Sequence, residues 1–67
     1  MSVARVTEIS SRSQTSFEAA INEGIDRANQ TLRNVRSAWI KEQQVDIENG
    51  RIVAYRVNML VTFVLDD

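Results

Sequence analysis

The chain has 67 residues, of which 43% are hydrophobic and 25% charged, and its formal net charge is −1. It contains no cysteine and no histidine, which excludes disulfides, thiolate nucleophiles, zinc–thiolate sites and Ser-His-Asp triads. The charge balance predicts no broad attraction to nucleic acid or to an anionic membrane surface. Because a core this small rarely supplies more than about 3–5 kcal/mol, we expect self-association or a bound ligand to stabilise the fold.

The chain also shows no sign of a membrane span, a leader or a catalytic constellation. Its longest apolar stretch, residues 59–65, is interrupted by Thr62 and is far too short to cross a bilayer. No charged-then-apolar leader opens the sequence, so we predict a cytoplasmic protein. No nucleophile, base and stabilising group occur together. We therefore predict a single domain over residues 1–67 that is not an enzyme.

The N-terminal half predicts a strand followed by a helix. Residues Val3–Ile9 have the β-branched content of a short strand, and the polar residues Ser10–Thr15 predict a loop. Thr15 and Glu18 are spaced as a capping box that would begin a helix. The helix is indicated by one apolar stripe at helical spacing, formed by Phe17, Ala20, Ile21, Gly24, Ile25, Ala28 and Leu32. On its opposite face, Glu23 and Arg27 are spaced for a weak ion pair.

The C-terminal half predicts a β-hairpin around Asn49-Gly50, because both residues accept the positive φ of a type I′ turn. A two-residue turn fixes the pairing of the two strands. The predicted pairs are Ile47 with Ile52, Val45 with Ala54, Gln43 with Arg56, Lys41 with Asn58, and Trp39 with Leu60. The order is then β-α-β-β, with the third strand between the other two and antiparallel to both. This is an α+β fold.

Side-chain alternation divides the hairpin into two faces. One face is apolar throughout and is expected to pack on the helix; it contains Val53, Tyr55, Val57, Met59, Val61, Phe63 and Leu65, joined by Ala38 and Ile40. The other face mixes polar residues with hydrophobic ones, among them Trp39, Val45, Ile47, Ile52, Leu60 and Val64. Since the sequence has no second helix to cover it, we predict that other copies, or a ligand held between copies, lie against this outer face. The alternative is a solvated sheet face.

These features together resemble the dodecin family. The resemblance rests on the segments Gly24–Ala28 and Thr31–Val35, the turn Ile47–Gly50 and the closing strand from Ala54 to Phe63. It covers essentially the whole chain. The resemblance implies a three-stranded antiparallel sheet wrapped around one helix and assembly as a hollow homododecamer. It also implies storage of riboflavin or FMN, bound in pairs at subunit interfaces, without catalysis.

Two positions depart from the flavin-binding pattern. Ser37 stands where flavin dodecins have a stacking tryptophan, and Arg56 stands where they have a glutamine that hydrogen-bonds the flavin ring. The segments Arg36–Ala38, Glu42-Gln43 and Tyr55-Arg56 resemble a second group of dodecins, which lacks that tryptophan and is described as calcium-binding. The resemblance thus leaves two ligand hypotheses, a flavin and a calcium ion in a flavin-free shell. The cofactor-binding residues that we predict are Ser37, Trp39, Arg56 and Gln43.

Several of these side chains have a second interpretation. Trp39, two residues beyond Ser37, either stacks on a flat ligand or packs on Leu60 and a neighbouring subunit as an interface anchor. Arg56 either binds a phosphate or carboxylate, or pairs with Asp46 or Glu42 of another subunit. Oxygen ligands for a hard cation are available on Glu8, Glu42, Asp46 and Glu48, although they have no EF-hand spacing and also suit a solvated surface.

Overall fold

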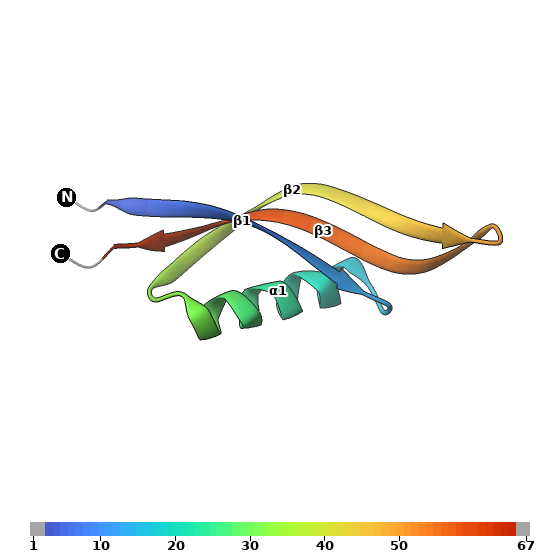
Figure 1. Cartoon of the computed structure of the whole chain (residues 1–67), viewed down its shortest axis with the longest axis horizontal. Coiled ribbons are helices and arrows are strands. Elements are labelled where there is room, and N and C mark those ends of the chain that lie inside the picture. Colours follow the sequence, from blue (N-terminus) through green and yellow to red (C-terminus); the bar gives the residue numbers. More distant parts are fainter. Residues whose placement is uncertain (1–2, 66–67) are drawn as a thin grey trace.

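The computed structural model describes residues 3–65 and has the predicted order of elements. These are β1 (Ala4–Ser13), α1 (Phe17–Thr31), β2 (Val35–Glu48) and β3 (Arg51–Val64). β3 lies between β1 and β2 and is antiparallel to both, which confirms the predicted α+β fold. α1 lies along one face of this sheet, and the β2–β3 hairpin extends well beyond the first turn of the helix (Figure 1). Residues 1, 2, 66 and 67 of the predicted domain lie outside the described residues.

β1 is longer than predicted. It continues through the run Ser10–Ser13, which we expected to be a loop, and Ser13 pairs with Tyr55 of β3. Backbone pairing with a central strand outweighs the low strand propensity of serine. The small side chains that face inward also fit the narrow space between β1 and α1. Ser11 lies against α1 at Gly24, and Ser13 is 8% exposed. The predicted boundary at Ile9 is therefore wrong.

α1 begins one residue later than the predicted capping box requires. The Ser16 hydroxyl, not that of Thr15, accepts a hydrogen bond from the Ala19 amide at 3.0 Å and caps the helix. The Thr15 amide donates to the Ser13 hydroxyl at 3.0 Å, and this local turn places Ser16 at the cap. Within residues 3–65, α1 is the one helix, and it is neither long nor apolar enough to cross a membrane.

The Asn-Gly turn is confirmed, with φ of 52° at Asn49 and 75° at Gly50. The predicted register is correct at both ends of the hairpin, where Ile47 pairs with Ile52 and Trp39 with Leu60. Between these ends it is wrong by one residue. One register shift adds a residue to β2 between Ile40 and Glu42, and a second adds one to β3 opposite the step from Asp46 to Ile47. These two irregularities compensate each other, so between Ser37 and the turn only the middle of the hairpin is displaced. A third shift, between Val35 and Ser37, displaces the start of β2 by one residue as well.

The core lies between α1 and the three strands. Its fully buried side chains on β3 are Val57, Met59 and Val61, as the inner face predicted. On α1 the buried positions are Ala20, Gly24 and Ala28, one small residue per turn. Small residues let the helix approach the sheet closely, and a Cβ atom added at Gly24 would lie only 2.6 Å from the terminal methyl carbon of Met59. Leu65, which was predicted to join this core, lies beyond the end of β3 and is 41% exposed.

Candidate ligand and interface surface

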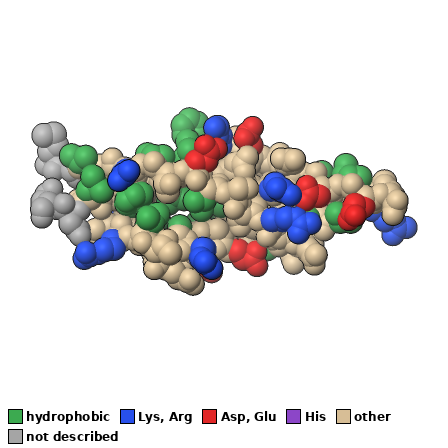
Figure 2. All heavy atoms as spheres, in the orientation of Figure 1, with side chains coloured by type: hydrophobic (Ala, Val, Ile, Leu, Met, Phe, Trp, Pro, Cys, Tyr) green, Lys and Arg blue, Asp and Glu red, His purple; other side chains and the backbone are tan. Residues whose placement is uncertain are grey.

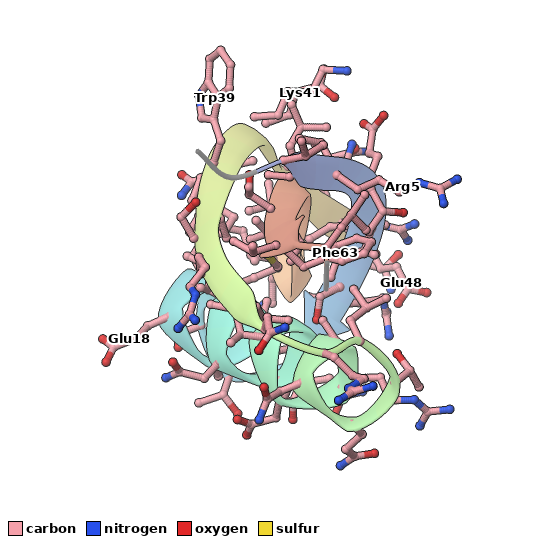
Figure 3. The ribbon with its side chains drawn as sticks, turned by 90° about the vertical axis from the view of Figure 1, so that its left-hand side faces the viewer. Arg5, Glu18, Trp39, Lys41, Glu48 and Phe63 are labelled. Atoms are coloured by element: carbon pink, nitrogen blue, oxygen red, sulfur yellow. The ribbon has the colours of Figure 1, made fainter. Side chains whose placement is uncertain are left out.

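Trp39 is the most exposed large hydrophobic residue of the outer face, the sheet face turned away from α1. It lies on β2 opposite Leu60, and 71% of it is exposed. Its indole points away from the helix, as does the side chain of Lys41 (Figure 3). No element of residues 3–65 packs over this side of the sheet. An indole left in water is typical of a residue that contacts a partner or a ligand.

Two of the other predicted site residues share this face. Ser37 precedes Trp39 by two residues without an intervening shift, and Arg56 lies on β3 in the same alternation as Leu60. Strand alternation therefore places Ser37, Trp39 and Arg56 on the outer face. The structure brings these three residues to one surface, as the sequence predicted.

The fourth predicted residue, Gln43, lies on the opposite face. It pairs with Val57, which is fully buried in the core, and directly paired residues share one face of a sheet. The extra residue in β2 near Lys41 reverses the alternation from that point onward. As a result Gln44, rather than Gln43, lies opposite Arg56. The predicted pairs Gln43–Arg56, Val45–Ala54 and Lys41–Asn58 are wrong for this reason.

The same displacement moves the exposed isoleucines of the hairpin. Asp46 pairs with Ala54 on the outer face. Ile47 is the next residue of β2, and the extra residue at this step belongs to β3, so the alternation of β2 is undisturbed. Ile47 and its partner Ile52 therefore lie on the face that α1 occupies further along the sheet, not on the outer face as predicted. They are nevertheless 62% and 53% exposed. The reason is that α1 begins at Phe17, whose ring contacts Tyr55 with a centroid distance of 5.1 Å.

Three side chains on three strands form what we call the Asp46 cluster, which consists of Arg12, Asp46 and Arg56. One carboxylate oxygen of Asp46 accepts hydrogen bonds from Arg12 Nε at 3.0 Å and from the Arg56 guanidinium at 3.1 Å. The predicted ion pair between Arg56 and Asp46 thus exists, but within one chain rather than between subunits. Arg56 Nε is buried and has no hydrogen-bond partner within residues 3–65. The cluster therefore links the two edge strands, β1 and β2, across the central strand β3.

The rest of this polar region is also internally paired. Lys41 Nζ lies 3.3 Å from a carboxylate oxygen of Glu8, and the Asn58 amide donates to Glu42 at 3.0 Å. With the Asp46 cluster, these pairs include three acidic and three basic groups, namely Glu8, Glu42, Asp46, Arg12, Lys41 and Arg56. Among residues 3–65 no three acidic side chains gather as a metal site. The outer face is therefore a charge-balanced strip beside an exposed indole.

The Asp46 cluster leads to a pH-dependent prediction. Hydrogen bonds from Arg12 and then from Arg56 hold the pKa of Asp46 below its ordinary value of 3.8. A carboxyl with a lowered folded-state pKa stabilises the protein above its unfolded pKa, and this contribution is lost as pH falls through the folded pKa. We expect Asp46→Asn to lower the Tm slightly at neutral pH, and the difference from wild type to shrink below about pH 4.

Thermal unfolding followed by circular dichroism from neutral pH to pH 2 would measure this difference. A matched control is Asp26→Asn on α1, because Asp26 is exposed and has no ion pair within residues 3–65. A Tm difference for D46N that stays constant across the whole pH range would contradict the role assigned to the cluster.

The chain is thus a small α+β protein with one layer of helix on one layer of sheet. Small residues of the helix pack on one face of the sheet, and the outer face is left uncovered. The model of the dodecin family matches residues 3–66, and the chain belongs to this family. It is 33% identical over 63 residues to the calcium dodecin of Mycobacterium tuberculosis, a match that covers 94% of this chain and 89% of that protein. The resemblance predicted from the sequence is confirmed.

Solved dodecin structures have the same fold. The dodecin from Streptomyces davaonensis matches with a TM-score of 0.93 and 36% identity, covering 98% of this chain and 97% of that one. The structure of the calcium dodecin from M. tuberculosis, which has a calcium-binding site, matches with a TM-score of 0.83 and 32% identity. That match covers 96% of this chain and 91% of the other.

Proposed function

We propose that this protein is a non-enzymatic binding and storage protein that assembles as a homododecamer and holds a small flat ligand, riboflavin or FMN, between copies. The observation that supports this most is the indole of Trp39, which is 71% exposed on a sheet face that α1 does not cover. An aromatic ring stacked on an indole contributes about 1–3 kcal/mol, by analogy with nucleobases. In a member of the dodecin family, such a ring is a reasonable platform for a flavin.

The neighbouring residues suit this proposal. Ser37 is small and exposed on the same face, so it leaves room for a ring that stacks on Trp39 instead. Arg56 supplies a guanidinium, which forms charge-assisted hydrogen bonds with phosphate, the group that distinguishes FMN from riboflavin. Gln44, opposite Arg56, takes the place of Gln43 as the amide on this face. The absence of cysteine and histidine is consistent with binding rather than catalysis.

A calcium ion is the second candidate, because the calcium dodecin of M. tuberculosis is 33% identical to this chain. Glu8, Glu42 and Asp46 offer carboxylate oxygens on the outer face, but each is engaged by a neighbour in its own chain. Calcium takes about six to eight oxygen ligands. In this proposal the ion lies where carboxylates of several copies meet, and it displaces some of these pairs.

Riboflavin fluorescence distinguishes the two candidates. We expect micromolar assembled protein to quench riboflavin emission, Trp39→Ala to abolish the quenching, and Trp39→Phe, which keeps a stacking ring, to retain part of it. If wild type gives no quenching but calcium raises the Tm of chelator-treated protein, the cation proposal replaces the flavin one. Light scattering on the same samples tests the assembly, and a folded particle of 7.6 kDa would overturn the shell.

A further inference from the structure

Two arginines lie directly opposite each other on the outer face. Arg12 of β1 pairs with Arg56 of β3, and directly paired residues share one face of a sheet. Like charges at such opposed positions repel each other and destabilise the pairing, unless an anion lies between them. Asp46 supplies one anion, because its carboxylate accepts hydrogen bonds from both guanidinium groups, at 3.0 and 3.1 Å.

One carboxylate does not neutralise two guanidinium groups, so the Asp46 cluster, with two positive groups and one negative group, keeps a net charge of +1. The carboxylate that balances the outer face as a whole is Glu42, which accepts instead from the Asn58 amide at 3.0 Å. In the described part of the chain, no acidic side chain except Asp46 lies within ion-pair distance of Arg12 or Arg56. Figure 2 shows basic side chains gathered beside acidic ones along the strands. The cluster therefore has the charge to bind a second anion.

The hydrogen-bond donors for that anion are also in place. A guanidinium carries five N–H groups, and Asp46 engages one nitrogen of each arginine. The side chains of Arg12 and Arg56 are 48% and 42% exposed, so a ligand can reach the groups that remain. Arg56 Nε is buried and has no hydrogen-bond partner within residues 3–65; such a donor commonly marks the place of a bound water or ion. Gln44, opposite Arg56 on β2, adds an amide that also donates.

We propose that the Asp46 cluster is a phosphate site, which holds the phosphate of a monoester between Arg12 and Arg56. A phosphate monoester carries a charge of about −1.5 to −2 at neutral pH and three acceptor oxygens. These match the positive charge of the cluster and the two arginine forks, which bind phosphate with two parallel hydrogen bonds each. Arg12 was not among the site residues predicted from the sequence, because only the strand register brings it beside Arg56.

Where the site bears on the ligand of the proposed function, it rests on that function and makes the ligand FMN rather than riboflavin. The site itself does not require a flavin, because free phosphate offers the same oxygens. The test therefore includes both sources of phosphate.

Titration calorimetry of the assembled protein with FMN and with riboflavin measures the contribution of the phosphate. Because charge-assisted hydrogen bonds are the stronger ones, we expect wild type to bind FMN at least about tenfold more tightly than riboflavin. Arg12→Gln removes one charge and should abolish this preference, whereas Arg12→Lys keeps the charge without the fork and should retain part of it. Far-UV circular dichroism shows whether each variant keeps its fold.

The matched control is Arg27→Gln on α1. Arg27 is exposed and lies outside the cluster, and the ion pair predicted between Glu23 and Arg27 is not formed within residues 3–65. This variant removes the same charge from the chain and should keep the wild-type preference for FMN. In a parallel measurement, inorganic phosphate should raise the Tm of wild type more than chloride does at equal ionic strength, and R12Q should lose the difference.

The possible outcomes separate this site from the flavin function. Equal affinities of wild type for FMN and riboflavin, or a preference for FMN that R12Q leaves intact, would overturn the phosphate site while flavin binding stands. If neither flavin binds but inorganic phosphate raises the Tm of wild type and not that of R12Q, the site stands and the flavin proposal fails. If neither flavin binds and phosphate has no more effect than chloride, both proposals are wrong.

Discussion

Replacing Trp39 with aspartate is expected to disassemble the protein while leaving each chain able to fold. In the isolated chain Trp39 is 71% exposed, so a carboxylate at this position remains in water. In an assembly that covers the outer face, the same carboxylate is buried without a partner. An uncompensated buried charge costs about 3–5 kcal/mol, which corresponds to more than a hundredfold in the association constant of each contact.

Size-exclusion chromatography with light scattering would measure the change, and far-UV circular dichroism would show whether the dissociated chain keeps its fold. Asn22→Asp is the matched control, because it adds the same charge at an exposed position of α1. Trp39→Phe keeps an apolar ring and should keep most of the assembly. Wild-type elution of W39D would show that no neighbouring copy covers this residue.

The outer face also shows how far sequence reasoning reaches. Residue alternation and the Asn-Gly turn correctly predicted the pairing of Trp39 with Leu60, and alternation along the strands places Ser37 and Arg56 on the same face as the indole. Gln43 was misplaced because the extra residue in β2 is offset by one in β3. These two compensating irregularities leave the pairs next to the turn and the pair Trp39–Leu60 unchanged. The position of a β-bulge depends on packing and strand twist rather than on a particular residue type, so no feature of the sequence predicted these two.

The errors at β1 and the helix cap have a related origin. Ser13, Thr15 and Ser16 all carry hydroxyls near the start of the helix. Two local hydrogen bonds decide among them, because the Thr15 amide donates to the Ser13 hydroxyl and the Ala19 amide donates to the Ser16 hydroxyl. The sequence marks a region rich in cap-forming residues but does not rank residues of nearly equal propensity. Likewise, the pairing of Arg56 with Asp46 was predicted from charge, but whether it joins one chain or two depends on a strand register that is not visible in the sequence.

The second prediction of large effect concerns the contact between Met59 and Gly24, which sets the distance between α1 and the sheet. Met59 is fully buried at the centre of β3. Truncating a buried methionine to alanine typically costs about 2–5 kcal/mol, because it removes packed atoms and leaves a cavity. We expect Met59→Ala to lower the free energy of unfolding by this amount, measured by chemical denaturation at fixed protein concentration.

Gly24→Ala tests the same contact from the helix side. Alanine favours a helix interior over glycine by about 1 kcal/mol, but its Cβ atom would lie 2.6 Å from the Met59 terminal methyl carbon and 3.1 Å from the Ser11 Cβ atom. In wild type we expect this overlap to offset the helix gain, whereas in the M59A background the new methyl group enters the vacated space. The double-mutant cycle should therefore give a favourable coupling of about 0.5–3 kcal/mol, as for other residues in direct contact. Equal effects of G24A in both backgrounds would mean that Met59 does not limit the approach of the helix to the sheet.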